Sequence, residues 1–566
     1  MNSLVALPVL LPLLAAGLEL ALGTRFPRAQ RAVGVLVLSA VLALSLTMLV
    51  EADRNGPLAL HLGDFAPPVG ITLVADRLSA LMLTVSSAVT LCVLVYSIGQ
   101  GMADREEQSP LAIYHPAYMV LVAGVSCTFL AGDLVNLYVG FEIMLVASFV
   151  LLTLGGTAAR LRAGATYVLV SLVSSMVFFT AVALTYAAAG TVSLGQLAQR
   201  LAELPVGVRT LLEVTLLTVF AVKAAVFPLG AWLPDSYPTT PAPVTAVFAG
   251  LLTKVGVYCV LRVETLLFPG NRLADLLMWA ALASLLIGVL GAVAQTDLKR
   301  LLSFVLISHI GYMIFGIGVG TRAGLGGAIV YVVHHITVQT ALFLVAGLIE
   351  RRTGTTELTR VGGLTRAAPA LAVLFLVPAL NLAGIPPMSG FIGKLQLLRA
   401  GVADAGFLAY LLVAAASLTS LLTLYVMAKV WNLAFWRAAA PDRPARVTVL
   451  EETDPDEDHA DSDSDTGSDT GPRSGSAPGS GSGDGTPADS SSRPQPAGQA
   501  VTATLFGRAI TTTTDRLPRS MTWATLAMVV LSLAYTVLGD PFTALTDRAA
   551  AELLLRSPYI EAVLGP

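Results

Sequence analysis

Charged residues are scarce in this chain of 566 residues. Asp, Glu, Lys and Arg together make up 13% of the sequence, whereas hydrophobic residues make up 55% and the mean hydropathy is +0.75. A soluble protein of this length needs far more charge on its surface. The composition therefore excludes a soluble globular domain and indicates that lipid is the solvent for most of the chain.

Cysteine is also rare, and the sequence lacks the motifs that bind redox groups. Cys92, Cys127 and Cys259 lie far apart and form no CxxC pair. We find no flavin or nucleotide fingerprint and no CxxCH haem motif. We therefore expect small packing cysteines, no cofactor, no metal site and no enzyme active site, and infer that the chain does not transfer electrons by itself.

What the sequence does contain is a succession of long apolar runs. A helix needs about 20 apolar residues to cross a hydrocarbon core of about 30 Å, and the runs predict about fourteen spans. The fold class expected is an all-α polytopic membrane protein. The first run lacks a basic segment and a clear cleavage site, so we expect it to be retained. The expected spans are 3–23, 31–50, 77–99, 113–131, 133–154, 164–189, 209–233, 241–265, 272–295, 301–321, 324–349, 368–400, 406–436 and 519–538.

Basic residues gather in alternate loops, which predicts an orientation. With fourteen spans, the loops after spans one, five, nine and eleven fall on one side, and the positive-inside rule makes that side cytoplasmic. Both termini would then lie outside the cell membrane. The acid-rich loop 51–76 falls on the external side. The basic loop residues are Arg25, Arg28, Arg31, Arg160, Arg162, Lys299, Arg300, Arg351, Arg352, Arg360 and Arg366.

One long segment does not belong to the membrane. Residues 451–470 contain ten carboxylates and no Lys or Arg, and Gly, Ser and Pro dominate the stretch that follows. Such a composition buries too little apolar area to fold, so we expect a disordered cytoplasmic insertion over 438–505. A solvated spacer and an acidic docking tail are both open interpretations.

A few ionisable residues lie inside the apolar runs. They are Glu142, Lys223, Lys254 and Lys394, together with the neighbouring His334 and His335. A charge at bilayer depth costs about 2.5–3.5 kcal/mol on the lenient insertion scale, so these groups should face the interior of the bundle and one another. One isolated pair fits a packing salt bridge as well as a functional pair. Three lysines and a glutamate over four spans favour a function in transport. His309 is interpreted as an interior packing histidine.

Prolines accompany two of these lysines. Pro228 follows Lys223, and Pro386 and Pro387 precede Lys394, so both spans are expected to break near mid-membrane. Broken helices in corresponding places of two halves are typical of inverted-repeat transporters, although a kinked packing helix is the alternative. We predict two inverted five-helix repeats, spans 4–8 and 9–13, each with a broken helix. The expected organisation is 1–110 (spans 1–3), 111–265 (first repeat), 266–437 (second repeat), 438–505 (insertion) and 506–566 (last span and tail).

Lysine suits a relay chemically. A buried lysine can release its proton, and a carboxylate nearby favours its recapture, whereas arginine stays charged. A Lys–Glu pair whose separation changes can thus take up and release a proton near neutral pH.

Four stretches resemble a known family. "GDLVNLYVGFEIMLVASFVLL", "KAAVFPLGAWLPDSYPTTPAPVTAVFAGLLTKVGVY", "QTDLKRLLSFVLISHIGYM" and "LAGIPPMSGFIGKLQLL" are similar to the antiporter-like membrane subunits. That family comprises the multisubunit Mrp-type Na+/H+ antiporters and the pump subunits of respiratory complex I. The resemblance covers about 1–437 and the last span, and it is strongest to the D subunits of Mrp antiporters.

The resemblance implies roles for the matching residues. Glu142 would be the carboxylate partner of Lys223, the switching lysine of the first half, and Lys254 would be the next relay. His334 or His335 would continue the path to Lys394 at the second broken helix. Relatives commonly have lysine where this chain has Gln339. Glutamine orients water but does not titrate, so the central relay depends more on histidines and water here.

Three functions follow from these patterns. The leading hypothesis is a proton-translocating subunit of a multisubunit Na+/H+ antiporter, which exchanges external H+ for cytoplasmic Na+ with other subunits as partners. The alternative is an M- or N-like proton-pumping subunit of NADH:quinone oxidoreductase or of a membrane-bound hydrogenase. A b-type haem anchor through His309 with His334 or His335 leaves the lysines unexplained. The sequence does not locate a Na+ site.

Overall fold

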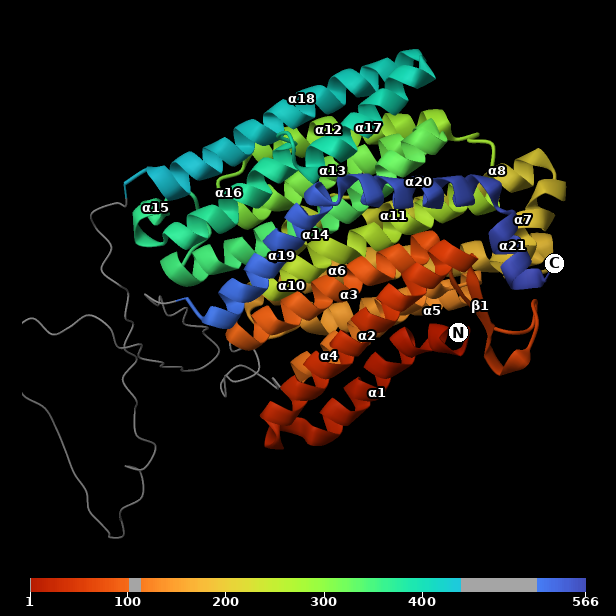
Figure 1. Cartoon of the computed structure of the whole chain (residues 1–566), viewed down its shortest axis with the longest axis horizontal. Coiled ribbons are helices and arrows are strands. Elements are labelled where there is room, and N and C mark those ends of the chain that lie inside the picture. The colour runs from red at the N-terminus through yellow and green to blue at the C-terminus, as the bar shows by residue number, and fades with distance from the viewer. Residues whose placement is uncertain (1, 101–112, 439–516, 566) are drawn as a thin grey trace, which may run out of the picture.

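The computed structural model describes residues 2–100, 113–438 and 517–565 of the chain. Within these ranges the protein is a bundle of long helices, most of which run roughly parallel (Figure 1). The long helices are α1 (Leu7–Leu22), α2 (Pro27–Asn55), α3 (Arg77–Gln100), α4 (Tyr114–Leu130), α5 (Leu134–Thr153), α6 (Ala158–Ala189), α8 (Val206–Ala224), α12 (Ala274–Ala294), α13 (Leu298–Val319), α14 (Arg322–Thr353), α16 (Pro369–Ala383), α17 (Ser389–Asp404), α18 (Phe407–Val430), α19 (Arg519–Val537) and α20 (Gly539–Leu555).

Between α8 and α12 the chain forms a composite helix. It consists of α10 (Ala242–Val247), a π-helical turn η7 (Phe248–Leu252), α11 (Thr253–Arg262) and a second π-helical turn η8 (Val263–Leu267). The shorter elements are α7 (Leu194–Arg200), α9 (Leu233–Ser236), α15 (Leu364–Ala367), α21 (Ser557–Leu564), the π-helical turn η9 (Trp431–Trp436) and the 3-10 turns Asn2–Ala6, Gly23–Arg25, Leu62–Asp64, Leu201–Glu203 and Tyr237–Thr239.

The longest buried helix, α14, lies in the middle of the bundle. Its 32 residues extend for about 48 Å at 1.5 Å per residue, and residues 324–349 are all buried. A helix that is apolar on every face must be covered on every face. Helices α3, α10, α13, α16, α17, α19 and α20 pack against it, and its His334, His335 and Gln339 therefore lie in the protein interior.

A two-stranded hairpin lies at one end of the bundle. Strands β1 (Leu58–His61) and β2 (Thr72–Ala75) are antiparallel, with Leu58 opposite Ala75 and His61 opposite Thr72. Both termini lie at this same end, and α15 lies at the opposite end (Figure 1). The sequence analysis did not foresee the hairpin, nor the helices α20 and α21 in the expected tail.

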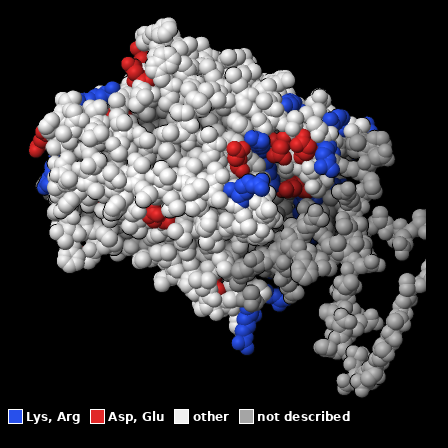
Figure 2. Space-filling model, turned by 180° about the vertical axis from the view of Figure 1, so that it is seen from behind, with Lys and Arg blue, Asp and Glu red and all other residues white. Residues whose placement is uncertain are grey.

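The predicted fold class is confirmed. Among the described residues, 11 helices are long and apolar enough to cross a membrane, and Tyr114–Leu130 and Pro369–Ala383 are shorter apolar helices. White atoms cover most of the molecular face drawn in Figure 2, and most of its charged side chains gather in a cluster to the right of the middle and at the edges. The number fourteen and the inverted repeats stay predictions, and the expected insertion 438–505 lies almost wholly outside the described residues.

Candidate functional site

The first part of the site joins α5, α6 and α8. Glu142 on α5 is half-buried, and its carboxylate accepts a hydrogen bond from the Ser175 hydroxyl on α6. The ammonium nitrogen of Lys223, in the last turn of α8, lies 5.9 Å from the centre of the Phe141 ring. Glu142 and Lys223 interact electrostatically. No ion pair within 4 Å joins Lys223 to a carboxylate in the described ranges, so this pair is separated.

Helix α8 ends one residue after Lys223. Ala225 adopts a left-handed conformation with φ of 59° and ends the helix, and Pro228 lies in the loop that leads to α9. The indole N–H of Trp232 donates to the carbonyl of Val222 at 3.3 Å, which also accepts from the backbone N–H of Ala225 at 3.2 Å, so this contact ties the loop to the end of α8. The expected interruption of the span near Pro228 is therefore present in the structure.

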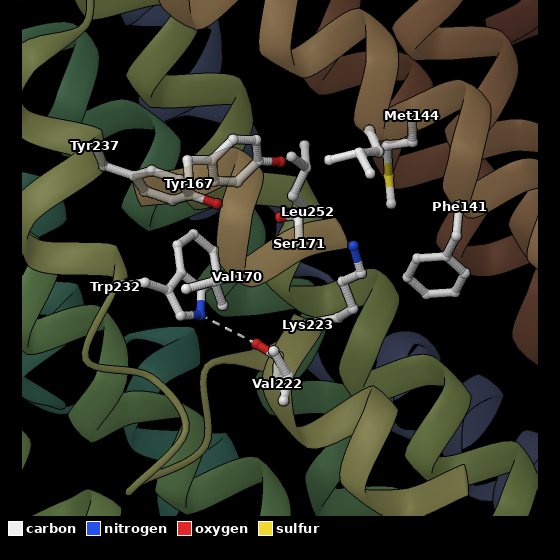
Figure 3. A pocket seen from close by; sticks show the side chains of 11 residues that line it. Phe141, Met144, Tyr167, Val170, Ser171, Val222, Lys223, Trp232, Tyr237 and Leu252 are labelled. Atoms are coloured by element: carbon white, nitrogen blue, oxygen red, sulfur yellow. Dashed lines mark hydrogen bonds between the residues drawn. The ribbon is translucent and has the colours of Figure 1, made fainter. Parts of the chain in front are cut away.

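A small cavity opens at this break. It lies among α5, α6 and α8, and the ammonium group of Lys223 points into it between Phe141 and Ser171 (Figure 3). About 20 Å³ is open to the centre of a water-sized sphere, which is enough for one water molecule. The other lining residues are Met144, Leu145, Tyr167, Val170, Val222, Trp232, Tyr237 and Leu252.

Lys254 is fully buried on α11. Its ammonium donates to the carbonyl of Ala249 at 2.5 Å, five residues earlier in the chain. Ala249 belongs to the π-helical turn η7, and π-helical turns leave helix carbonyls misaligned with the regular ladder and often occur at functional sites. The sequence predicted the lysine but did not foresee the carbonyl that holds it.

A cluster of histidines and tyrosines lies in the middle of the bundle. The rings of His309 and His335 are 5.2 Å apart, and the Tyr331 hydroxyl lies 2.8 Å from Nδ1 of His309. His334 Nδ1 lies 3.0 Å from the Ser389 hydroxyl at the start of α17. The charge of Lys254 acts on His335 and His309. The sequence analysis interpreted His309 as a packing residue, whereas in the structure it lies between Tyr331 and His335.

Lys394 on α17 lies in a cradle made by the second helix break. Its ammonium donates to the carbonyls of Leu382 and Ala383 at 2.9 Å each and to the Ser420 hydroxyl at 3.1 Å. The two carbonyls belong to the last turn of α16, where helix carbonyls lack intrahelical partners and the helix dipole favours a cation. Pro386 and Pro387 lie in the short connection between α16 and α17.

Gln339 lies on α14 in the region between the two halves. Its amide N–H donates to the carbonyl of Leu302 at 2.9 Å, and its buried amide oxygen has no partner in the part of the chain that the structure describes. Thr340, the next residue, lies against Gly250 of η7. The Gln339 side chain thus contacts α13, and its amide oxygen can accept a hydrogen bond from a water molecule.

The structure places the six predicted residues in two groups. Glu142 and Lys223 interact at the first helix break, whereas His334, His335 and Lys394 lie around Tyr331 and Tyr312, where the charge of Lys254 acts on His335. That these six residues form one proton path stays a prediction. Sequence reasoning missed Ser175, Tyr331, Ser389 and Ser420, which are common residues without a spacing signal. In the described part of the chain, no group of three or more His, Cys, Asp or Glu side chains is arranged to hold a metal ion.

With this geometry established, comparison with known proteins identifies the family. A family model described as "NADH:quinone oxidoreductase/Mrp antiporter, TM" matches residues 131–423, which is more than half of the chain. The chain belongs to this family. The matched range contains all six predicted site residues and both helix breaks.

Individual members of the NADH:quinone oxidoreductase/Mrp antiporter family are similar over most of the chain. The D subunit of the Na(+)/H(+) antiporter of Alkalihalophilus pseudofirmus OF4 is 42% identical over 440 residues, covering 77% of this chain and 87% of that protein. A chain of the Mrp complex from Dietzia sp. DQ12-45-1b has a TM-score of 0.82 and 31% identity, with all of both chains covered. A chain of respiratory complex I from Thermus thermophilus has a TM-score of 0.66 and 29% identity, covering 77% of this chain and 90% of that one.

Proposed function

We propose that this chain is the proton-translocating subunit of a multisubunit monovalent cation/proton antiporter, which exchanges external H+ for cytoplasmic Na+. The observation that carries the proposal is the row of buried titratable groups from Lys223 through Lys254 and His335 to Lys394. Burial of these groups is costly, and a purely structural role would be met by apolar side chains. Similarity to Na+/H+ antiporter D subunits supplies the sodium part of the proposal.

The relay has a simple physical basis. Lys223 can approach or leave Glu142, because the described structure holds no ion pair that fixes the two side chains together. Protonation of one lysine repels a proton on the next, so a charge change at Lys223 is felt at Lys254 and then at the histidine cluster. Lys394, which is held by two carbonyls and a hydroxyl, is the terminal group of the path.

The proposed setting is a plasma membrane with related and smaller subunits as partners. The termini and the hairpin would face outward, and the insertion over 438–505 would face the cytoplasm. The two five-helix repeats, 111–265 and 266–437, are proposed on the basis of the helix breaks at Pro228 and at Pro386. The chain would act as a transporter subunit without an enzyme reaction of its own.

Replacing Lys223 or Glu142 tests the proposal. Lys223→Ala and Glu142→Ala should abolish the Na+-dependent pH response of inverted membrane vesicles while the complex still assembles. Lys429→Ala is a matched control, because the Lys429 ammonium donates to the carbonyls of Val293 and Gln295, away from the path. A wild-type response from either site variant would contradict the proposal.

A role in a redox-driven pump is the second candidate, because the complex I chain has a related fold. The two functions differ in their driving reaction. If Na+ alone fails to move protons in vesicles that hold the intact complex, but NADH oxidation succeeds, the redox-driven function replaces the antiporter.

A further inference from the structure

Two buried carboxyl groups lie near one end of the helices that carry Lys223 and Lys254. Glu213 on α8 is fully buried, and Glu264 on η8 is 6% exposed. Among the described residues, none of their four oxygens has a hydrogen-bond partner. The two carboxyl groups interact electrostatically with one another. Burial of two carboxylates without partners is unfavourable, so this pair must hold a proton or another cation.

The spacing relates the two glutamates to the two lysines. Glu213 precedes Lys223 by ten residues on α8, and Glu264 follows Lys254 by ten residues on the composite helix. A separation of ten residues is about 15 Å along a helix axis at 1.5 Å per residue. Because the chain runs in opposite directions along the two helices, the carboxyl groups share one level and the lysines share another.

Close packing keeps this register. A Cβ at Gly256 would lie 2.5 Å from the backbone nitrogen of Ala224, so α11 and α8 touch directly beside the lysines. The two helices also pack at the level of η8. Glu213 and Glu264 lie toward the end of the bundle that holds the hairpin, since η8 also packs against α20 and α7.

A cavity lies between the two levels. It is lined by Phe220 of α8, which is between Glu213 and Lys223, and by Tyr258 and Cys259, which are between Lys254 and Glu264. About 10 Å³ is open to the centre of a water-sized sphere, close to the room that one water molecule needs. Arg262 also lines this cavity, which lies between the two levels without reaching either the carboxyl groups or the lysines.

The surroundings favour a proton over a sodium ion. The arginines Arg209 and Arg272 act electrostatically on Glu213, and Arg556 donates to the carbonyl of Leu266 beside Glu264. A hard cation needs several oxygen ligands converging on it, whereas a proton needs only one carboxyl oxygen. Five other charged side chains on α7, α11 and α20 form hydrogen bonds or ion pairs with other residues. They are Arg200 with the carbonyl of Ala189, Arg262 with Asp76, Glu552 with Arg77, Asp547 with Arg322 and Arg548 with Asp53.

We propose that Glu213 and Glu264 are proton-carrying carboxyl groups that form the external proton-loading site for Lys223 and Lys254. The site rests on the proposed function, since it supplies protons to the same lysines from the outer side. Protons reach the two carboxyl groups from the hairpin end, and loss of a proton from Glu213 leaves a charge that Arg209 and Arg272 stabilise. The next proton from outside then restores the pair.

The test uses the whole complex in proteoliposomes, with the pH set separately on the two sides. Glu213→Gln and Glu264→Gln keep the size of the side chain and remove its proton exchange. Each should lower Na+-driven proton exchange about tenfold at external pH 8 and much less at external pH 6, where protons are plentiful. The response to cytoplasmic pH should not change. Glu203→Gln is the control, because Glu203 is exposed in the turn before α8.

Glu213→Asp distinguishes a loss of proton exchange from a loss of folding. It keeps a carboxyl group, so it should recover most of the external pH response. Exchange by both Gln variants that equals wild type at every external pH would overturn the site, as would a change in Na+ half-saturation with no change in pH response. Equal loss in the Gln and Asp variants would also overturn it. A wild-type complex that shows no Na+-driven exchange would instead refute the proposed function.

Discussion

Removal of the Ser175 hydroxyl tests how the carboxylate of Glu142 is held. The hydroxyl donates to the carboxylate, and no other hydrogen bond to Glu142 is present among the described residues. A hydrogen bond to a charged group contributes about 1.5–3 kcal/mol, and the half-buried position of Glu142 favours the lower end. A loss of about 1.5 kcal/mol corresponds to about a tenfold change in the population of the conformation in which Ser175 holds the carboxylate. Ser175→Ala should therefore slow Na+-driven proton exchange about tenfold.

The neighbouring residue provides a matched control for this experiment. Ser174 is on the same helix and is buried, but its hydroxyl has no hydrogen-bond partner within the described ranges. Ser174→Ala should leave the exchange rate within about twofold of wild type. Initial rates of acridine fluorescence recovery after Na+ addition, per assembled complex, provide the measurement. Wild-type rates in Ser175→Ala, or equal losses in both variants, would refute the reasoning about Glu142.

Two further predictions concern stability. Burial acts to raise the pKa of Asp76, but Arg262 at 2.5 Å and bonds from Ser79 outweigh burial and hold that pKa below its usual range. The ionised Asp76–Arg262 pair thus contributes fully to the free energy of unfolding above about pH 4, and this contribution is lost only in stronger acid. Asp76→Asn should therefore lower the free energy of unfolding by about 3–5 kcal/mol, equally at pH 6 and pH 8. A loss of thermal stability that is present at one of these pH values and absent at the other would contradict this. Gly256→Ala should lower the melting temperature because its Cβ would meet the backbone of α8, whereas Gly207→Ala, with open space around it, should not; equal melting of the two variants would show that the close approach is unimportant.

The ionisable residues of the path could be predicted because each one interrupts an apolar run. Glu142, Lys223 and Lys394 are conspicuous in sequence for that reason, and the prolines beside the two lysines indicate broken helices. Their partners are different. Ser175 and the carbonyl of Ala249 acquire a role only through packing and a π-helical turn, neither of which leaves a distinctive spacing.

Other features of the structure could not be predicted from the sequence pattern. Helix α20 contains several charged residues, so it lacks the apolar run that marks a span and was expected to be a tail. The hairpin lies in the loop between two expected spans, and its strands have only four residues each, which is too short for a clear alternating pattern. Glu213 and Glu264 lie near the ends of predicted spans, where a carboxylate normally reaches water, and only the tertiary structure shows that both are buried.

The most direct test of the central claim is Na+ flux through the purified complex in liposomes without NADH or any other redox substrate. An imposed proton gradient should drive 22Na+ across the wild-type complex, and both Lys223→Ala and Lys394→Ala should stop the flux in complexes that remain assembled. Sodium flux that persists in these variants, or that is absent from the wild type until a redox substrate is added, would contradict the account.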